Sequence, residues 1–380
     1  MATTLTNLLP DAYAALDVVS RELVGFIPAT QRDMSADRAA LNQTIRSFVA
    51  PANTTANITP AMTPPTPGAQ TIGNRTLSIT KSKFAAFEWS GEDQRSADTG
   101  PGYLSVRQDQ IAQAIRVIVN EVEADIAALH IYASRAYGTA GTTAFATDLS
   151  DTAQLRKILD DNGAPPSDRH LVIDTGAGAK MRTLTQLTKA NEAADISMLR
   201  QGVLLDIHGM AIRESAQVVN PFVKGTGASY TTSAAGFAVG VTSIPIITGT
   251  GTVLAGDVVT FAGDTNKYLV VTGVGAPGTV VIAAPGLRVA IAASATAMTI
   301  AANSVRSMAF SRNAIALATR LPALPNDGDL ATDRTVLTDP RSGLSFELAY
   351  YPGFRMGGYF IGLAWGTANM KPEHSAILLG

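Results

Sequence analysis

The stretch SVRQDQIAQAIRVIVNEVEADIAALHIYASRAY, residues 105–137, carries the strongest helical pattern in the sequence. Its apolar residues recur three and four positions apart, so they form one continuous stripe along a helix. They are Ile111, Ile115, Ile118, Val122, Ile126, Leu129 and Ala133. Ser105 with Gln108 resembles a capping box, and Gly138 suits the residue that follows a helix. We expect one spine helix about 50 Å long, covered along its stripe by other elements.

The charged residues Arg116, Glu123 and Arg135 of this stretch do not belong to the apolar stripe. Charged side chains are rarely buried without a partner. We therefore expect them to be exposed or to pair with neighbouring subunits.

Three segments precede the spine helix. Residues 11–24 have Leu16, Val19 and Leu23 at helical spacing and predict an amphipathic helix. Residues 50–74 are rich in proline, which disfavours both helix and central strand, so we expect an extended arm or loop. Residues 75–84 alternate in polarity, as a strand does.

Residues 140–222, after the spine helix, alternate between helical and strand patterns. We expect a compact mixed α/β region there. The helices are predicted around 155–159 and 180–189, and the strands at 171–174, 204–212 and 216–219.

The composition changes sharply at about residue 223. Up to residue 305 the sequence has few charges and many Val, Ile, Thr, Gly and Ala residues in short apolar runs. Strands are predicted at 257–262, 268–272 and 279–283, with Gly-rich turns between them. This pattern favours an all-β barrel or sandwich inserted into the surrounding fold.

Mixed strands resume after this region. They are predicted at 311–319, 345–351 and 354–363, with turns at 325–328, 339–340 and 357–358.

The composition excludes several classes of protein. Charged residues make up 16% of the 380 residues, against about 25% in a typical domain, and the formal net charge is −2. A basic nucleic-acid-binding face would need clustered Lys and Arg. There is no cysteine, hence no disulfide or thiolate chemistry. We find no secretory signal and no apolar run of about 18 residues, so we expect no membrane span and a cytoplasmic site of synthesis.

One segment imitates an enzyme motif. The apolar run Leu171 to Ile173 leads into Asp174-Thr-Gly, as in aspartic proteases, whose chemistry needs two carboxylates. A second Asp98-Thr-Gly has polar, turn-like flanks, although Asp174 could pair with its own copy in a dimer. Gly176-Ala-Gly178 is a truncated dinucleotide fingerprint. We interpret the segment as a strand end and a tight turn, and keep the protease as an alternative.

Other catalytic patterns are missing from the sequence. The four histidines, His130, His170, His208 and His374, have no partner at the spacing of a zinc motif. No nucleophile elbow and no phosphate-binding loop occurs. We therefore predict no catalytic, cofactor-binding or metal-binding residues, no cofactor and no enzyme activity.

Three stretches carry a family resemblance: AGDVVTFAG at 255–263, AFSRNAIALA at 309–318 and GLAWGTANMKPE at 362–373. With the order of elements, they make the chain resemble the major capsid (coat) protein of tailed bacteriophages, which has the Hong Kong 97-type fold. More narrowly, the chain is similar to the Salmonella short-tailed-phage branch, which carries an inserted β-barrel domain.

The resemblance implies an α+β capsid fold with six parts. These are an N-terminal arm (1–49), an extended loop (50–85), a peripheral domain with the spine helix (86–140 and 345–365), an axial domain (141–222 and 305–344), an inserted β-barrel domain (223–304) and a C-terminal segment (366–380). The arm and the loop would lap over neighbouring subunits.

The resemblance also implies a function and partners. The chain would assemble with itself, through hexamers and pentamers, into an icosahedral shell around double-stranded DNA, which it would enclose without specific binding. A scaffolding protein, a portal and a decoration protein are expected partners, and the virion, assembled in the bacterial cytoplasm, is the expected location. A cargo-encapsulating nanocompartment shell is a second alternative, because such shells share the fold.

Overall fold

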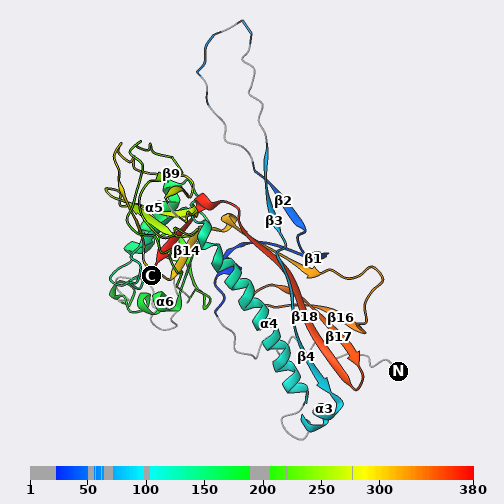
Figure 1. Ribbon diagram of the computed structural model, residues 1–380. Helices are drawn as coiled ribbons and strands as arrows, with labels where there is room; N and C mark the ends of the chain where they lie inside the picture. Colours follow the sequence, from blue (N-terminus) through cyan, green and yellow to red (C-terminus); the bar gives the residue numbers. More distant parts are fainter. Residues whose placement is uncertain are drawn as a thin grey trace.

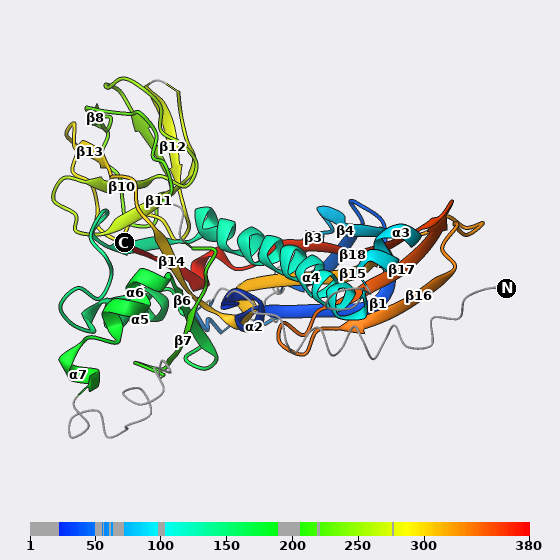
Figure 2. The same cartoon turned by 90° about the horizontal axis from the view of Figure 1, so that it is seen from below.

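The computed structural model describes residues 23–49, 55, 57–60, 62–63, 72–97, 103–188, 206–218, 221–275 and 277–380. Most of its strands belong to two large sheets, and a long helix, α4 (Tyr103–Ala127), runs beside one of them (Figures 1 and 2). The predicted helix 11–24 and most of the proline-rich segment 50–74 lie outside the described residues.

Helix α4 is the predicted spine; it contains five of the seven residues of the predicted apolar stripe, and all seven are buried. It has 25 residues, hence a length of about 38 Å, because it ends at Ala127 and not at Tyr137. A 3₁₀ turn, η1 (Ala128–Tyr132), follows it and keeps Leu129 buried, so the apolar spacing continues past the helix end. Tyr103 already belongs to the helix, so Ser105 does not cap it.

The chain after η1 forms strand β5 (Arg135–Gly138), so Gly138 ends a strand and not the spine helix. The expectation that Glu123 and Arg135 are exposed or pair with other subunits is also wrong. Both are buried, and both have partners within the chain.

The first sheet has six strands and lies against α4. In β18 the side chains alternate: Tyr359, Ile361 and Leu363 belong to the core that α4 helps to form, whereas Phe360 and Gly362 face the other side. The strand order is β1 (Gln31–Ala39), β15 (Ile315–Pro322), β18 (Met356–Asn369), β17 (Ser345–Gly353) and β16 (Asp333–Thr338), and β4 (Lys81–Ser90) also pairs with β18.

The second sheet has eleven strands, and the short helices α5 (Ser150–Asp161), α6 (Thr175–Met181) and α7 (Thr185–Thr188) accompany it. Its order is β7 (Met210–Glu214), β6 (Arg169–Ile173), β14 (Arg306–Ser311), β19 (Ser375–Leu379), β5, β11 (Lys267–Thr272), β10 (Val258–Phe261), β13 (Ala297–Ile300) and β8 (Tyr230–Thr231). Strand β12 (Gly278–Ile282) pairs with β11 and with β9 (Ser243–Ile246).

Strands β8 to β13 form a lobe beside the rest of the molecule, which we call the β-lobe (residues 221–275 and 277–304; Figure 2). Its two ends are adjacent, since the Phe222 amide donates to the Ser304 carbonyl at 2.8 Å. It has an apolar core of its own, but β11 also pairs with β5. The inserted all-β domain and its boundaries stay predictions.

A two-stranded hairpin, β2 (Thr44–Val49) and β3 (Gly73–Ser78), projects from the body (Figure 1). The predicted strand 75–84 is two strands, because residues 79 and 80 belong to neither β3 nor β4. Leu77 and Ile79 are buried at this junction.

Several finer predictions differ from the structure. Residues 180–188 belong to two short helices, α6 and α7, and not to one. Residues 216–218 form no strand, and a 3₁₀ turn, η2 (Arg312–Ala314), divides the predicted strand 311–319. The strands of residues 305–344 divide between the sheets: β14 lies in the second, and β15 and β16 lie in the first.

The remaining short elements lie at the ends of strands. They are α2 (Phe26–Ala29), α3 (Gly91–Ala97) and η3 (Pro372–His374).

Candidate functional site

Asp174 occupies a structural position, at the start of α6. Its carboxylate accepts a hydrogen bond from the Ala177 amide at 3.0 Å and one from the Ser307 hydroxyl at 3.4 Å. This is the geometry of a helix N-cap. Asp98, the second carboxylate of the protease alternative, lies outside the described residues. The position of Asp174 as a helix cap therefore gives it a structural role that requires no catalytic function.

The glycines after Asp174 serve close packing. A side chain at Gly178 would collide with the Glu214 carboxylate. That carboxylate binds both Nη atoms of Arg182, at 2.6 and 2.5 Å. Gly178 therefore leaves room for this ion pair where α6 meets β7, and this accounts for the second glycine of the truncated dinucleotide fingerprint.

The four histidines lie apart, each with its own neighbours. His170 Nε2 is 3.0 Å from Asp168 Oδ1, and His208 Nδ1 is 2.6 Å from the Thr152 hydroxyl. Burial lowers the pKa of His130 to about 4, and the nearby Arg306 adds to this shift. Among the described residues, no group of three or more His, Cys, Asp or Glu side chains is placed to hold a metal ion.

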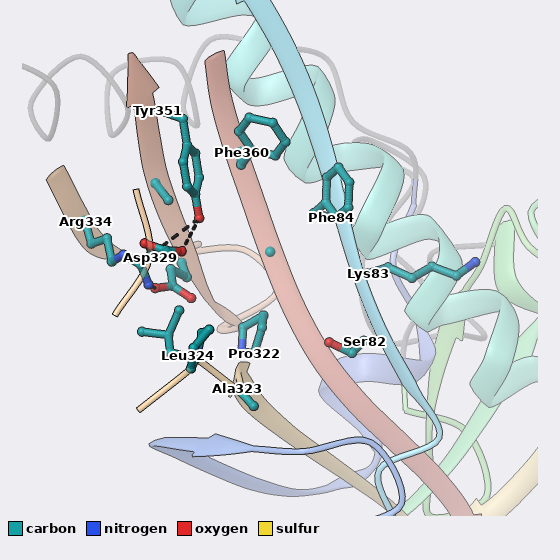
Figure 3. Close-up of a pocket in the computed structure, with 14 residues that line it drawn as sticks. Ser82, Lys83, Phe84, Pro322, Ala323, Leu324, Asp329, Arg334, Tyr351 and Phe360 are labelled. Carbon is teal, nitrogen blue, oxygen red and sulfur yellow. Dashed lines mark hydrogen bonds and ion pairs between the residues drawn. The ribbon is translucent and has the colours of Figure 1, made fainter. Parts of the chain in front are cut away.

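A pocket of about 440 Å³ opens on the face of the first sheet that points away from α4 (Figure 3). Its apolar wall comes from β4, β17 and β18. The Phe84 and Phe360 ring centroids are 5.3 Å apart, and those of Tyr351 and Phe360 are 5.0 Å apart. Pro322 and Leu324, at the end of β15 and just after it, line the pocket too. An apolar group of a partner would fit this wall.

Charged side chains form the opposite wall of the pocket. Glu347 accepts from both Nη atoms of Arg38, at 2.7 and 3.0 Å, and from Arg334 at 3.3 Å. Asp329 pairs with Arg334 and accepts from the Tyr351 hydroxyl at 2.6 Å (Figure 3). The hydrogen bond from Tyr351 and the Arg334 charge lower the pKa of Asp329 to about 2.

These charges define what the pocket can do. Asp329 is ionised at neutral pH, and a carboxylate with so low a pKa is a poor general acid or base. With aromatic rings on one wall and paired charges on the other, the pocket is suited to binding a partner group that is apolar at one end and polar at the other.

Large apolar side chains are fully exposed at the projecting parts of the molecule. Ile58 and Met62, beyond β2, are 100% and 104% exposed, and Phe354, at the β17–β18 turn, is 91% exposed. Such side chains could contribute to a contact with a partner only together with other apolar groups, because singly exposed apolar residues are common. The pocket could not be predicted from the sequence, because it collects residues from strands far apart in the chain.

The described helices include none with the length and apolar character needed to cross a lipid bilayer.

Comparison by sequence finds no matching family model and no matching curated protein. Comparison of structures finds solved structures with a similar fold. The alignment with the capsid of cyanophage P-SCSP1u covers 100% of this chain and 92% of that chain, with a TM-score of 0.52 and 12% sequence identity. A Mycobacterium phage Che8 structure also matches, with a TM-score of 0.44 and 14% identity, over 96% of this chain and 90% of that chain. The mature capsid of bacteriophage PhiM1 matches with a TM-score of 0.46 and 11% identity, over 96% of this chain and 89% of that chain. At such low identity the cyanophage likeness shows the fold alone: the chain has the fold of a phage capsid protein.

Proposed function

We propose that this chain is the major capsid protein of a tailed phage, a structural protein of the virion. The observation that carries the proposal is the likeness to the cyanophage capsid, which extends over the whole of this chain and nearly all of the other. The projecting hairpin with its exposed Ile58 and Met62, and the partly apolar pocket on the first sheet, suit a subunit that is completed by its neighbours.

In detail, the fold is of the Hong Kong 97 type, with the α4 sheet as the peripheral domain and the β-lobe as an inserted domain. Subunits assemble through hexamers and pentamers into an icosahedral shell in the host cytoplasm. The shell encloses double-stranded DNA without specific binding, which agrees with a net charge of −2. A scaffolding protein, a portal and a decoration protein are the expected partners. We assign no catalytic, cofactor or metal site.

Expression of the chain, alone and with a candidate scaffolding protein, followed by negative-stain electron microscopy, tests the proposal. Closed uniform shells or capsomer-sized rings are the expected result. A monodisperse monomer or dimer under every condition would overturn it. Shells that form inside cells around a protein cargo would favour the nanocompartment alternative, so the nucleic-acid and protein contents of purified shells are measured too.

A further inference from the structure

Three carboxylates follow one another at alternate positions in one turn of α4, Glu121-Val-Glu-Ala-Asp125. Residues four apart in a helix share a face, and a residue two positions away points to the opposite side. Glu121 and Asp125 are therefore on one side of α4 and Glu123 is on the other. Glu121 and Asp125 are partly exposed, whereas Glu123 is fully buried.

Glu123 holds the chain just before β1. Its Oε1 accepts from the Gly25 and Phe26 amides at 2.6 and 2.7 Å, and its Oε2 accepts from the Ile27 amide at 3.0 Å. Phe26 and Ile27 are buried in the main core, so the contact fixes this part of the chain to the body.

The backbone at this contact is tightly enclosed. A Cβ atom on Gly25 would lie 2.7 Å from the Glu214 carbonyl oxygen, so only glycine fits. Three consecutive amides directed at one carboxylate fix both the position and the direction of the segment. Apolar packing alone would fix the direction less strictly, because the hydrophobic effect is not directional.

Glu121 and Asp125 hold the root of the hairpin on the other side of α4. Lys81 Nζ lies 2.9 Å from Glu121 Oε1 and 2.8 Å from Asp125 Oδ1, and Lys83 Nζ also binds Glu121. The Trp365 indole donates to Asp125 at 2.8 Å. Lys81 is the first residue of β4, and only two residues separate it from the hairpin strand β3.

We propose that this single turn of α4 is a shared anchor, which fixes the position of residues 25–27, just before β1, and the direction in which the β2–β3 hairpin leaves the body. Glu121, Glu123 and Asp125 are then positioning residues for contacts between subunits. The role in assembly rests on the proposed function, whereas the anchoring itself is a property of the single chain. A displacement of this turn would move both segments together.

Amide hydrogen exchange of the full chain, measured by mass spectrometry, tests the anchor at Glu123. In Glu123→Ala we expect exchange in residues 23–30 to rise at least tenfold, with peptides from β17 and β18 unchanged. Glu123→Gln keeps one acceptor oxygen, so its rise is smaller. Asp109→Asn, an exposed change on the same helix, is the matched control. Unchanged exchange at 23–30, or an even rise over the whole chain in both variants, would overturn the proposal.

The same measurement tests the other side of the turn. Lys81→Met keeps most of the side-chain volume but removes the charge, and we expect a local rise of exchange in residues 73–84. Lys157→Met, at an exposed position in α5, is the control. An unchanged exchange pattern in Lys81→Met would show that Glu121 and Asp125 do not hold the hairpin.

Assembly of the same variants separates the anchor from the function. We expect at least tenfold fewer closed shells from Glu123→Ala and Lys81→Met, with partial rescue in Glu123→Gln and normal shells from both controls. Normal shells from the anchor variants would overturn their role in assembly and leave the proposed function standing. If the unmodified chain forms no shells, the proposed function fails, and the exchange data still decide whether the turn is an anchor.

Discussion

His130 and Arg306 meet at the ring of Phe222, where the body joins the β-lobe. The Arg306 guanidinium lies 3.8 Å from the ring centroid, and the His130 ring meets the Phe222 ring edge-on at 5.6 Å. Arg306 also donates to the Gly256 carbonyl in the β-lobe. Burial lowers the pKa of Arg306 to about 10. A second positive charge on His130 would therefore be strongly unfavourable here.

The first prediction concerns the pH dependence of stability. The pKa of His130 is lowered from 6.5 to about 4 in the folded chain, so the unfolded chain binds more protons between these values. Its contribution to stability is thus complete above pH 6.5 and is lost as the pH falls toward 4, by about 3 kcal/mol at most. Urea unfolding at several pH values should show this loss in the wild type and not in His130→Phe. Parallel losses in both chains would contradict the prediction.

The second prediction concerns Asp174. Because its carboxylate caps α6, Asp174→Ala should reduce the free energy of unfolding by about 1 kcal/mol, and Asp174→Ser should restore most of it. Shell assembly should persist in both variants. A pepstatin-sensitive peptidase activity that disappears in Asp174→Ala would instead support the protease alternative.

Among the elements, α4 shows how much of the fold could be predicted from the sequence. Its burial pattern follows from the spacing of its apolar residues alone, because a helix turns by a fixed angle per residue. Its end at Ala127 could not be predicted in this way, since η1 continues the same spacing. The chain leaves the helix because β5 pairs with β19 and β11, and these partners lie far away in the sequence.

In strand β18, the local sequence predicted a turn where the structure has a continuous strand. Gly357 and Gly358 predicted a turn, but both residues lie within β18, and the turn is at Phe354 and Arg355. Gly357 is needed because a Cβ atom there would collide with the Tyr350 side chain. Tertiary packing therefore explains this glycine, and the local sequence does not contain that information.

The pocket on the first sheet could not be predicted from the sequence for a similar reason. Phe84 and Tyr351 come together only through the pairing of β18 with β4 and β17.

The third prediction compares neighbouring residues of α4. Ile118→Ala should destabilise the chain by about 2–5 kcal/mol, because Ile118 is buried in the main core. Val117→Ala, one residue away and 61% exposed, should change stability by less than about 0.5 kcal/mol. Chemical denaturation of both variants measures the difference. Equal effects would show that Ile118 and Val117 are equally buried, and hence that α4 is rotated about its axis relative to this structure.

At the scale of the whole molecule, the β-lobe is joined to the body by more than its two chain connections. Val258 and Leu269 of the β-lobe share an apolar cluster with Ala136, Ile377 and Leu379 of the body. The buried Arg135 also lies 3.2 Å from Asn266 Oδ1 of the β-lobe. The β-lobe therefore covers a part of the core of the second sheet. The two ends of the β-lobe, Phe222 and Ser304, are nevertheless adjacent, as the ends of an inserted domain would be.

The fourth prediction follows from this shared core. Replacing residues 223–303 by a short Gly-Ser linker should destabilise the remaining chain by on the order of 5 kcal/mol, because Ile377 and Leu379 lose their cover. Solubility and urea unfolding of the shortened chain test this, with Val239→Ser, an exposed change within the β-lobe, as the control. A soluble shortened chain of unchanged stability would show that the β-lobe is an independent unit.

Strand β19 (Ser375–Leu379) also has a consequence for the timing of folding. It lies between β14 and β5, and pairs with both of them. A ribosome makes it after every other described strand of this sheet, so β14 and β5 gain their common partner only once residues 375–379 have emerged. The second sheet is thus completed late in translation.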